Sequence, residues 1–214
     1  MNPELRRHAE VLRAGLDSLG IRTSEAQRDR LLAYLGELTE WNRAYNLTAV
    51  RDPGEMVVRH LLDSAAILPW LDPGELLDVG SGAGLPGIPL AILQPERSLV
   101  LLDANGKKAR FMRHAVRQLG LDNVQVIESR LETCTAGPFP GIVARAFAEP
   151  VELLAAVRPF CKPGGAVYAM IGRKPETVPE ATGFDYERCA RLDVPGLEAD
   201  RNLLIYHRWP ESSQ

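Results

Sequence analysis

The sequence predicts an α/β protein with a seven-stranded, mostly parallel sheet, an antiparallel hairpin at the sheet edge and a helical N-terminal extension. Two observations lead to this prediction. From about residue 75 onward, short apolar runs alternate with helical stretches, which is typical of the βαβ units of a parallel sheet. Residues 1–70 instead carry their hydrophobic side chains at helical spacing. We therefore expect a helical extension over 1–70 and a sheet-containing unit over 71–214, packed together.

The extension contains two recognisable helix starts. Ser24 followed by Gln27 predicts a capping box. The string DPGE at residues 52–55 predicts a second start, and its helix, over 56–68, is expected to end at Pro69. A stripe at helical spacing follows the first start, and we expect it to pack in the core: Leu31, Leu35, Leu38, Trp41 and Tyr45.

Seven strands are predicted after the extension. Five apolar runs are expected to pair in parallel: 75–79, 98–102, 124–127, 141–144 and 166–171. Two further segments, 186–194 and 202–209, flank a Pro195-Gly196 turn, which predicts an antiparallel pair at the sheet edge.

The most informative segment is LLDVGSGAGLPG, residues 76–87, in which an apolar run and an acid precede four glycines in eight positions. A strand that ends in such a loop lets backbone N–H groups approach a nucleotide-like ligand. The carboxylate of Asp78 would repel the pyrophosphate of a dinucleotide, whereas S-adenosyl-L-methionine has no phosphate and offers an ammonium group. The pattern therefore favours S-adenosylmethionine, bound by Asp78, Gly80, Gly82 and Gly84.

Two other interpretations of this loop stay open. Gly82, Gly84 and Gly87 also match G-x-G-x-x-G, a dinucleotide-binding pattern that is weak on its own. A glycine-rich turn can also serve only to pack a helix closely on a sheet.

Further cofactor contacts are expected where the next two strands end. Asp103 lies 23 positions after Gly80, where an acid binds ribose hydroxyls in nucleotide-binding folds. Asp103 can also cap the following helix, and the two roles are compatible. Residues 129–132, SRLE, follow the third strand, where adenine is usually held; a plain surface loop is the alternative.

The end of the fourth strand reads IVARAFA over residues 142–148. It lacks the (N/D)-P-P-(Y/F) motif for methylating an exocyclic amine, and it lacks a Pro-Cys pair for covalent attack. It offers Arg145, a cation at the ligand crevice of a parallel sheet, and Phe147, which either packs in the core or stacks on a base.

Composition sets outer limits on function. A net charge of −3 argues against indiscriminate nucleic-acid coating. Five basic residues without an acid nevertheless fall on one predicted helix, which either contacts RNA phosphates or is merely solvated: Lys107, Lys108, Arg110, Arg113 and Arg117.

Three scattered cysteines and four histidines predict no metal site. Without an apolar run of about 18 residues or a signal peptide, we expect a cytoplasmic protein that contacts no membrane.

Several strings together resemble one family. They are WNRAYNLT at 41–48, RHLLDS at 59–64, GSGAGLPGIP at 80–89 and RAFA at 145–148, and the turn KPGG at 162–165 is similar to that of class I methyltransferases. In this order, from about residue 20 to 209, they resemble the bacterial ribosomal small-subunit methyltransferase G family, also called glucose-inhibited division protein B. Pro150, directly after Glu149, departs from the expected pattern and puts the start of the next helix in doubt.

The resemblance implies a class I (Rossmann-like) methyltransferase that uses S-adenosylmethionine to methylate N7 of a guanine in 16S ribosomal RNA. It implies cofactor contacts, without zinc or a covalent nucleophile, at Gly80, Leu85, Leu131, Glu132 and Arg145. Candidates for holding the RNA loop are Asn42, Arg43, Arg59 and His60, together with Lys107, Lys108, Arg113 and Arg117. The expected partner is 16S RNA, the small ribosomal subunit or its assembly intermediate. We expect the protein itself to be a monomer.

Guanine N7 carries an in-plane lone pair and no proton, so this reaction needs no general base and we expect no catalytic side chain. Two alternatives remain. A small-molecule methyltransferase would tolerate neutralisation of the basic helix, and a nicotinamide-dependent oxidoreductase would bind NAD(P).

Overall fold

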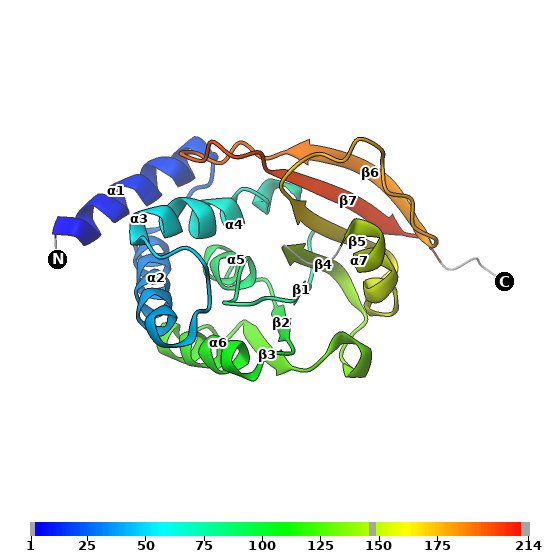
Figure 1. Ribbon diagram of the computed structural model, residues 1–214, viewed down its shortest axis with the longest axis horizontal. Helices are drawn as coiled ribbons and strands as arrows, with labels where there is room; N and C mark the ends of the chain where they lie inside the picture. Colours follow the sequence, from blue (N-terminus) through cyan, green and yellow to red (C-terminus); the bar gives the residue numbers. More distant parts are fainter. Residues whose placement is uncertain (1–2, 146–148, 211–214) are drawn as a thin grey trace.

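The computed structural model describes residues 3–145 and 149–210 (Figure 1). Phe147 therefore lies outside the described residues. Seven strands form one sheet in the order β3-β2-β1-β4-β5-β7-β6. Their bounds are β1 Leu76–Val79, β2 Leu99–Asp103, β3 Val124–Glu128, β4 Phe139–Arg145, β5 Cys161–Ile171, β6 Phe184–Arg191 and β7 Asn202–Arg208.

The strand directions match the predicted sheet. Strands β1 to β5 pair in parallel, while β7 runs antiparallel to both β5 and β6. The antiparallel pair is thus at the sheet edge, with β6 outermost. Because the carboxyl ends of the parallel strands share one edge of the sheet, the loops after β1, β2 and β4 are brought together there.

One predicted turn lies inside a strand. The KPGG string at 162–165 is part of β5, between the pairs Phe139–Cys161 and Gly141–Ala166, where the register shifts. A Cβ at Gly165 would come within 2.8 Å of the Pro140 carbonyl oxygen, so the strands can approach here only without a side chain. The string forms a bulge rather than a turn before the strand.

Helices cover both faces of the sheet (Figure 1). Helices α5 (Gly87–Leu93) and α6 (Gly106–Leu119) lie on one face, and α7 (Pro150–Val157) lies on the other. Short 3-10 turns follow β3 and α7, η3 at Leu131–Thr133 and η4 at Arg158–Phe160. Pro150 occupies the first turn of α7, where a missing N–H costs no helical hydrogen bond, so the helix forms despite the unusual proline.

The N-terminal extension consists of α1 (Pro3–Ser18), α2 (Glu25–Tyr45), α3 (Pro53–Met56), η1 (Val57–Leu62), α4 (Asp63–Ala65) and η2 (Leu68–Trp70). Its buried side chains belong to the same hydrophobic cluster as α5, α6 and one face of the sheet. The segment after β6 also joins this cluster through Leu192 and Val194. The extension and the sheet thus share one core.

Both predicted helix starts are confirmed. Ser24 Oγ accepts from the Gln27 N–H at 3.2 Å, and Gln27 Oε1 accepts from the Ser24 N–H at 2.9 Å. Asp52 caps α3 by accepting from the Glu55 N–H at 2.8 Å. The single helix expected over 56–68 is instead interrupted by η1, a π-helical segment, which sequence spacing did not predict.

Among the described residues, no helix combines the length and the apolar character needed to cross a membrane.

Candidate cofactor site

The glycine loop after β1 depends on backbone conformations that suit glycine. Gly80, Gly82 and Gly84 have φ values of +69°, +60° and +84°. The N–H groups of Gly80 and Ser81 both donate to the Leu102 carbonyl, at 2.8 and 3.1 Å. The loop is therefore tightly folded and closed onto the end of β2.

The glycines of the loop have two different purposes. A Cβ at Gly84 would overlap the Ile88 side chain, and one at Gly87 would overlap the Leu101 side chain, so these positions let α5 pack on the sheet. A Cβ at Gly82 would have no atom closer than 3.9 Å beyond its chain neighbours. Close packing therefore explains Gly84 and Gly87 but not Gly82, which faces open space.

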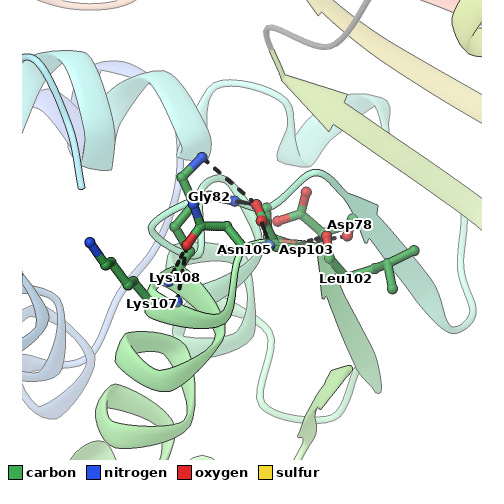
Figure 2. Close-up of polar contacts among 8 residues, drawn as sticks. Asp78, Gly82, Leu102, Asp103, Asn105, Lys107 and Lys108 are labelled. Carbon is green, nitrogen blue, oxygen red and sulfur yellow. Dashed lines mark hydrogen bonds and ion pairs between the residues drawn. The ribbon is translucent and has the colours of Figure 1, made fainter. Parts of the chain in front are cut away.

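Asp103 joins the glycine loop to the next βα turn (Figure 2). Its Oδ2 accepts from the Gly82 N–H and its Oδ1 from the Asn105 N–H, both at 2.8 Å. Lys108 Nζ lies 3.9 Å from Oδ2. A carboxylate oxygen has two lone pairs, so each still has one to offer the hydroxyls of a ligand over Gly82.

The expectation that Asp103 also caps the following helix is wrong. The N-cap of α6 is Asn105, whose Oδ1 accepts from the N–H groups of Lys107 at 3.0 Å and Lys108 at 3.3 Å. The cap therefore lies two residues later than expected.

Asp78 lies beneath the loop and is fully buried. Its Oδ2 accepts from the Gly87 N–H at 2.9 Å, whereas its Oδ1 is buried without a hydrogen-bond partner among the described residues. Burial raises the pKa of Asp78 to about 7, although the Gly87 bond and the Arg145 charge lower it in part. Asp78 thus supports the start of α5 and places a titratable charge under the loop, rather than projecting into the open space.

The N-terminal extension holds the loop from the other side. The Tyr34 hydroxyl, on α2, donates to the Ala83 carbonyl at 2.6 Å, and its burial raises the pKa of that hydroxyl far above the usual value. Gln27 donates through Nε2 to the carbonyls of Ile92 and Leu93, at 3.1 and 3.0 Å, where α5 ends. Sequence analysis missed Tyr34, although a hydroxyl within an apolar stripe is a signal that it needs a partner.

Arg145 ends β4 and is held by the extension as well. Its Nη1 lies 3.4 Å from Asp63 Oδ2 and donates to the Arg59 carbonyl at 3.2 Å. Asp63, with a side chain only 2% exposed, also accepts from Arg201 Nε at 2.9 Å. Sequence analysis missed Asp63 and Arg201, which turn Arg145 into one part of a three-residue ionic cluster.

The remaining predicted cofactor residues lie near the ends of β1 and β3. Leu85 is buried within the glycine loop. Leu131 and Glu132 form the turn η3, where Leu131 packs against the core on the α7 side and Glu132 is exposed. Strand β3 lies two places from β1 in the sheet, so a ligand that touches all three must extend over β2.

Comparison with known proteins identifies the family. Residues 27–204 match the family model described as rRNA small subunit methyltransferase G. A protein named Ribosomal RNA small subunit methyltransferase G from Pseudomonas syringae pv. tomato is 47% identical over 204 residues, covering 94% of this chain and 97% of the relative. One from Marinobacter nauticus is 48% identical over 200 residues, covering 92% and 94%. This chain belongs to the rRNA small subunit methyltransferase G family.

The fold of this methyltransferase G family member is similar to that of solved methyltransferase structures. A SAM-dependent methyltransferase from Aquifex aeolicus superposes with a TM-score of 0.56 at 17% identity, over 75% of this chain and 96% of that one. The glycopeptide N-methyltransferase MtfA, in complex with S-adenosyl-L-methionine, superposes with a TM-score of 0.57 at 12% identity, over 71% and 87%. The sheet and helices are thus those of class I methyltransferases.

Two of the eight RNA candidates in this methyltransferase G chain are corrected by the structure. Asn42 is buried, and its amide donates to the Val50 carbonyl at 3.2 Å and accepts from the Thr48 N–H at 2.9 Å. His60 is buried 3.0 Å from Thr48 Oγ1, and burial, followed by the Arg145 charge, lowers its pKa to about 4. Both side chains hold the segment 46–50 in place and are not available to RNA.

The other six candidates are at the surface. Arg43 is exposed on the last turn of α2, and Arg59 is exposed 3.6 Å from Glu55. The exposed basic residues of α6 are Lys107, Arg110, Arg113 and Arg117, and Lys108, beside Asp103, is half-exposed. In residues 3–145 and 149–210, no group of three or more His, Cys, Asp or Glu side chains is arranged to hold a metal ion.

Proposed function

We propose that this chain transfers the methyl group of S-adenosylmethionine to N7 of a guanine in 16S ribosomal RNA. Membership of the methyltransferase G family, over most of the chain, carries the proposal. The site fits the cofactor in one particular respect: the open face of Gly82 lies beside the Asp103 carboxylate, as a ribose-bearing ligand requires.

Different residues of the chain would bind different parts of the cofactor. Asp103 would accept hydrogen bonds from the ribose hydroxyls, and the turn with Leu131 and Glu132 would hold the adenine. The backbone of Gly80, Gly82, Gly84 and Leu85 would line the cradle, with Arg145 at the β4 side. When bound, S-adenosylmethionine supplies an electrophilic methyl group on a positively charged sulfonium.

Asp78 would act on this cofactor through its charge. Its carboxyl group is fully buried, so it would act from beneath the loop rather than by contact with a ligand in the cradle. An ionised carboxylate beneath the loop nevertheless attracts a cation above it in a medium of low dielectric. Asp78 also shapes the loop by holding the Gly87 N–H.

The reaction needs positioning rather than proton transfer. Guanine N7 has a lone pair and carries no proton, so no proton would have to be removed. The protein's contribution would be to orient the guanine and to exclude water. The product base is positively charged, so the pairing of Arg145 with Asp63 would limit unfavourable positive charge at the crevice.

We propose 16S RNA, in the small ribosomal subunit or its assembly intermediate, as the partner of a cytoplasmic monomer. Exposed cations at Arg43, Arg59 and along α6 would contact RNA phosphates. Such contacts position a duplex or loop without reading its sequence.

The test is methylation of defined RNA by the purified protein. Small subunits and bare 16S RNA from a strain that lacks the gene would be incubated with labelled S-adenosylmethionine, and N7-methylguanine would be mapped by chemical cleavage. We expect one modified guanine, and none with the Gly82→Asp variant. Turnover of small molecules without modified RNA would overturn the proposal, as would tight NAD(P) binding without S-adenosylmethionine binding.

A further inference from the structure

A hollow lies beside the basic helix α6, outside the candidate cofactor site. Its volume is about 490 Å³, and its walls come from α2, α6 and the end of β3. The residues that matter are Trp41, Arg110, Arg113, His114, Arg117 and Glu128. An aromatic ring therefore shares one concave surface with three arginines.

The hydrophobic stripe of α2 comes to the surface at this hollow. Leu31, Leu35 and Leu38 are buried, as predicted for core positions. Trp41 is only partly buried, and Tyr45 is 40% exposed. The expectation that the stripe packs in the core is therefore wrong for Tyr45, whereas Trp41 packs against the core with part of its ring still accessible.

The Trp41 ring is held firmly from several sides. Its ring centroid lies 5.6 Å from that of Phe111, 4.9 Å from that of His114 and 5.3 Å from that of Tyr45. His114 is itself fixed by Glu37, 2.7 Å away. A ring that is already immobilised loses little conformational entropy when a planar ligand stacks on it.

The charge of the hollow is positive on balance. Arg113 pairs with Glu128 at 2.9 Å. Arg110 and Arg117 form no ion pair within the part of the chain that the structure describes. Two guanidinium groups thus remain for an anionic ligand next to the aromatic ring.

From this arrangement we propose that the hollow binds an unpaired nucleotide of the substrate RNA, with its base stacked on Trp41 and its phosphates between Arg110 and Arg117. Aromatic rings for bases, combined with cations for the backbone, are the features that recognise single-stranded nucleic acid. The bases of an RNA duplex are stacked inside and cannot reach such a ring. An acidic peptide would satisfy the arginines but would leave the ring unused.

The hollow begins at the N-terminal end of α6, next to the candidate cofactor site. Gly106, at the start of α6, lines the hollow, and the preceding residues, Asn105 and Asp103, belong to the cofactor site. From Lys107 to Arg117 the helix rises by about 15 Å. RNA held here would thus leave the cofactor site along the basic face of α6. This inference rests on the proposed function, since it assumes an RNA substrate.

The test compares RNA binding by two variants and two matched controls. Trp41→Leu removes the ring, and Arg110→Glu/Arg117→Glu reverses the unpaired charges. Trp209→Leu removes an exposed tryptophan beyond β7, and Arg191→Glu reverses an exposed arginine on β6, at the opposite edge of the sheet. Affinities would be measured for a single-stranded 16S RNA fragment, for an RNA duplex and for heparin, a polyanion without bases.

We expect Trp41→Leu to weaken binding of the single strand by about tenfold, while heparin binding is unchanged, because stacking contributes about 1–3 kcal/mol per base. The double arginine variant should weaken the binding of both the single strand and heparin. The controls should change neither, and every variant should keep its affinity for S-adenosylmethionine. If Trp41→Leu lowers the melting temperature, Tyr45→Ala removes an exposed ring that lies 5.3 Å from the Trp41 ring and should weaken single-strand binding by loosening Trp41, without removing a buried core side chain.

Equal loss of heparin and single-strand binding in Trp41→Leu would overturn the stacking site, as would unchanged RNA affinity in both Trp41→Leu and Tyr45→Ala. Either result leaves the proposed function intact if the wild-type protein methylates 16S RNA. Failure of the wild-type protein to methylate any RNA would instead reject the proposed function.

Discussion

Tyr34 donates a hydrogen bond of 2.6 Å to the carbonyl of Ala83, across 49 positions of the chain. The bond joins the N-terminal extension to the middle of the glycine loop. The extension thus contributes directly to the shape of the candidate cofactor site, in addition to offering a surface for RNA.

Replacing Tyr34 by phenylalanine should therefore weaken cofactor binding. The change leaves the Ala83 carbonyl without its partner in a buried position, which costs about 1–3 kcal/mol. Tyr206→Phe is a matched control, since that hydroxyl donates to the Pro179 carbonyl at 2.9 Å, far along the chain from the loop. We expect both variants to melt earlier and only Tyr34→Phe to bind S-adenosylmethionine less tightly in calorimetry. Equal affinities in both variants would show that the bond only stabilises the fold.

The open face of Gly82 leads to a second prediction. Gly82→Ala and Gly82→Asp should both lower S-adenosylmethionine affinity, the aspartate variant beyond detection, because their side chains enter the space above the loop. Gly120→Ala controls for backbone strain, since Gly120 also has a φ of +60° and no atom within 4 Å of an added Cβ. Each alanine should cost about 1–2 kcal/mol of stability through this strain. Normal cofactor affinity in Gly82→Ala would mean that the ligand does not lie over Gly82.

A third prediction concerns pH and Asp78. Its folded pKa, about 7, is raised from an ordinary value of 3.8. The folded state therefore holds this proton more tightly than the unfolded chain does. The resulting stability is fully present below about pH 4 and is lost as the pH rises through 7, by a total of about 4 kcal/mol.

The Asp78→Asn variant isolates this effect. His60 acts in the opposite direction, because its lowered pKa removes stability as the pH falls from 6.5 to about 4. His60 contributes equally to both proteins, so its contribution cancels in the difference between the unfolding free energies of the wild type and Asp78→Asn. We expect the unfolding free energy of the wild type to fall relative to that of Asp78→Asn as the pH rises from 4 to 7.5. Cofactor affinity should rise over pH 6–8 in the wild type and stay flat in the variant, because the cationic ligand favours ionised Asp78. Parallel stability curves would show that Asp78 does not titrate in this range.

The parts of the structure that local patterns determine were predictable from the sequence. Apolar runs located the five parallel strands, the Pro195-Gly196 turn located the antiparallel pair, and Ser24 with Gln27 located the start of α2. The contacts that complete the site are different in kind. Tyr34 with Ala83, and Asp63 with both Arg145 and Arg201, join residues 49, 82 and 138 positions apart. Periodicity and spacing in a single sequence do not indicate which distant residues come into contact, so these pairs could be identified only in the structure.

The ionic cluster around Asp63 changes what is expected of Arg145. Sequence analysis alone placed Arg145 among the cofactor contacts and assigned it no role in the fold. Because Asp63 is buried and binds Arg145, the Arg145→Ala variant should lose stability, by about 2 kcal/mol in urea unfolding. Arg201→Ala should lose more, since its bond to Asp63 is 2.9 Å rather than 3.4 Å. Arg191→Ala, at an exposed pair with Asp193, should change stability by less than about 0.5 kcal/mol.

A double-mutant comparison separates this structural effect from a role in binding. In an Asp63→Asn background the carboxylate is absent, so Arg145→Ala should cost much less stability than it does in the wild type. Any loss of methylation that persists in this background, measured well below the melting temperature, belongs to the contacts of Arg145 with cofactor or RNA. If Arg145→Ala costs the same stability in both backgrounds, the 3.4 Å pair contributes nothing to the fold, and Arg145 at the end of β4 acts on ligands alone.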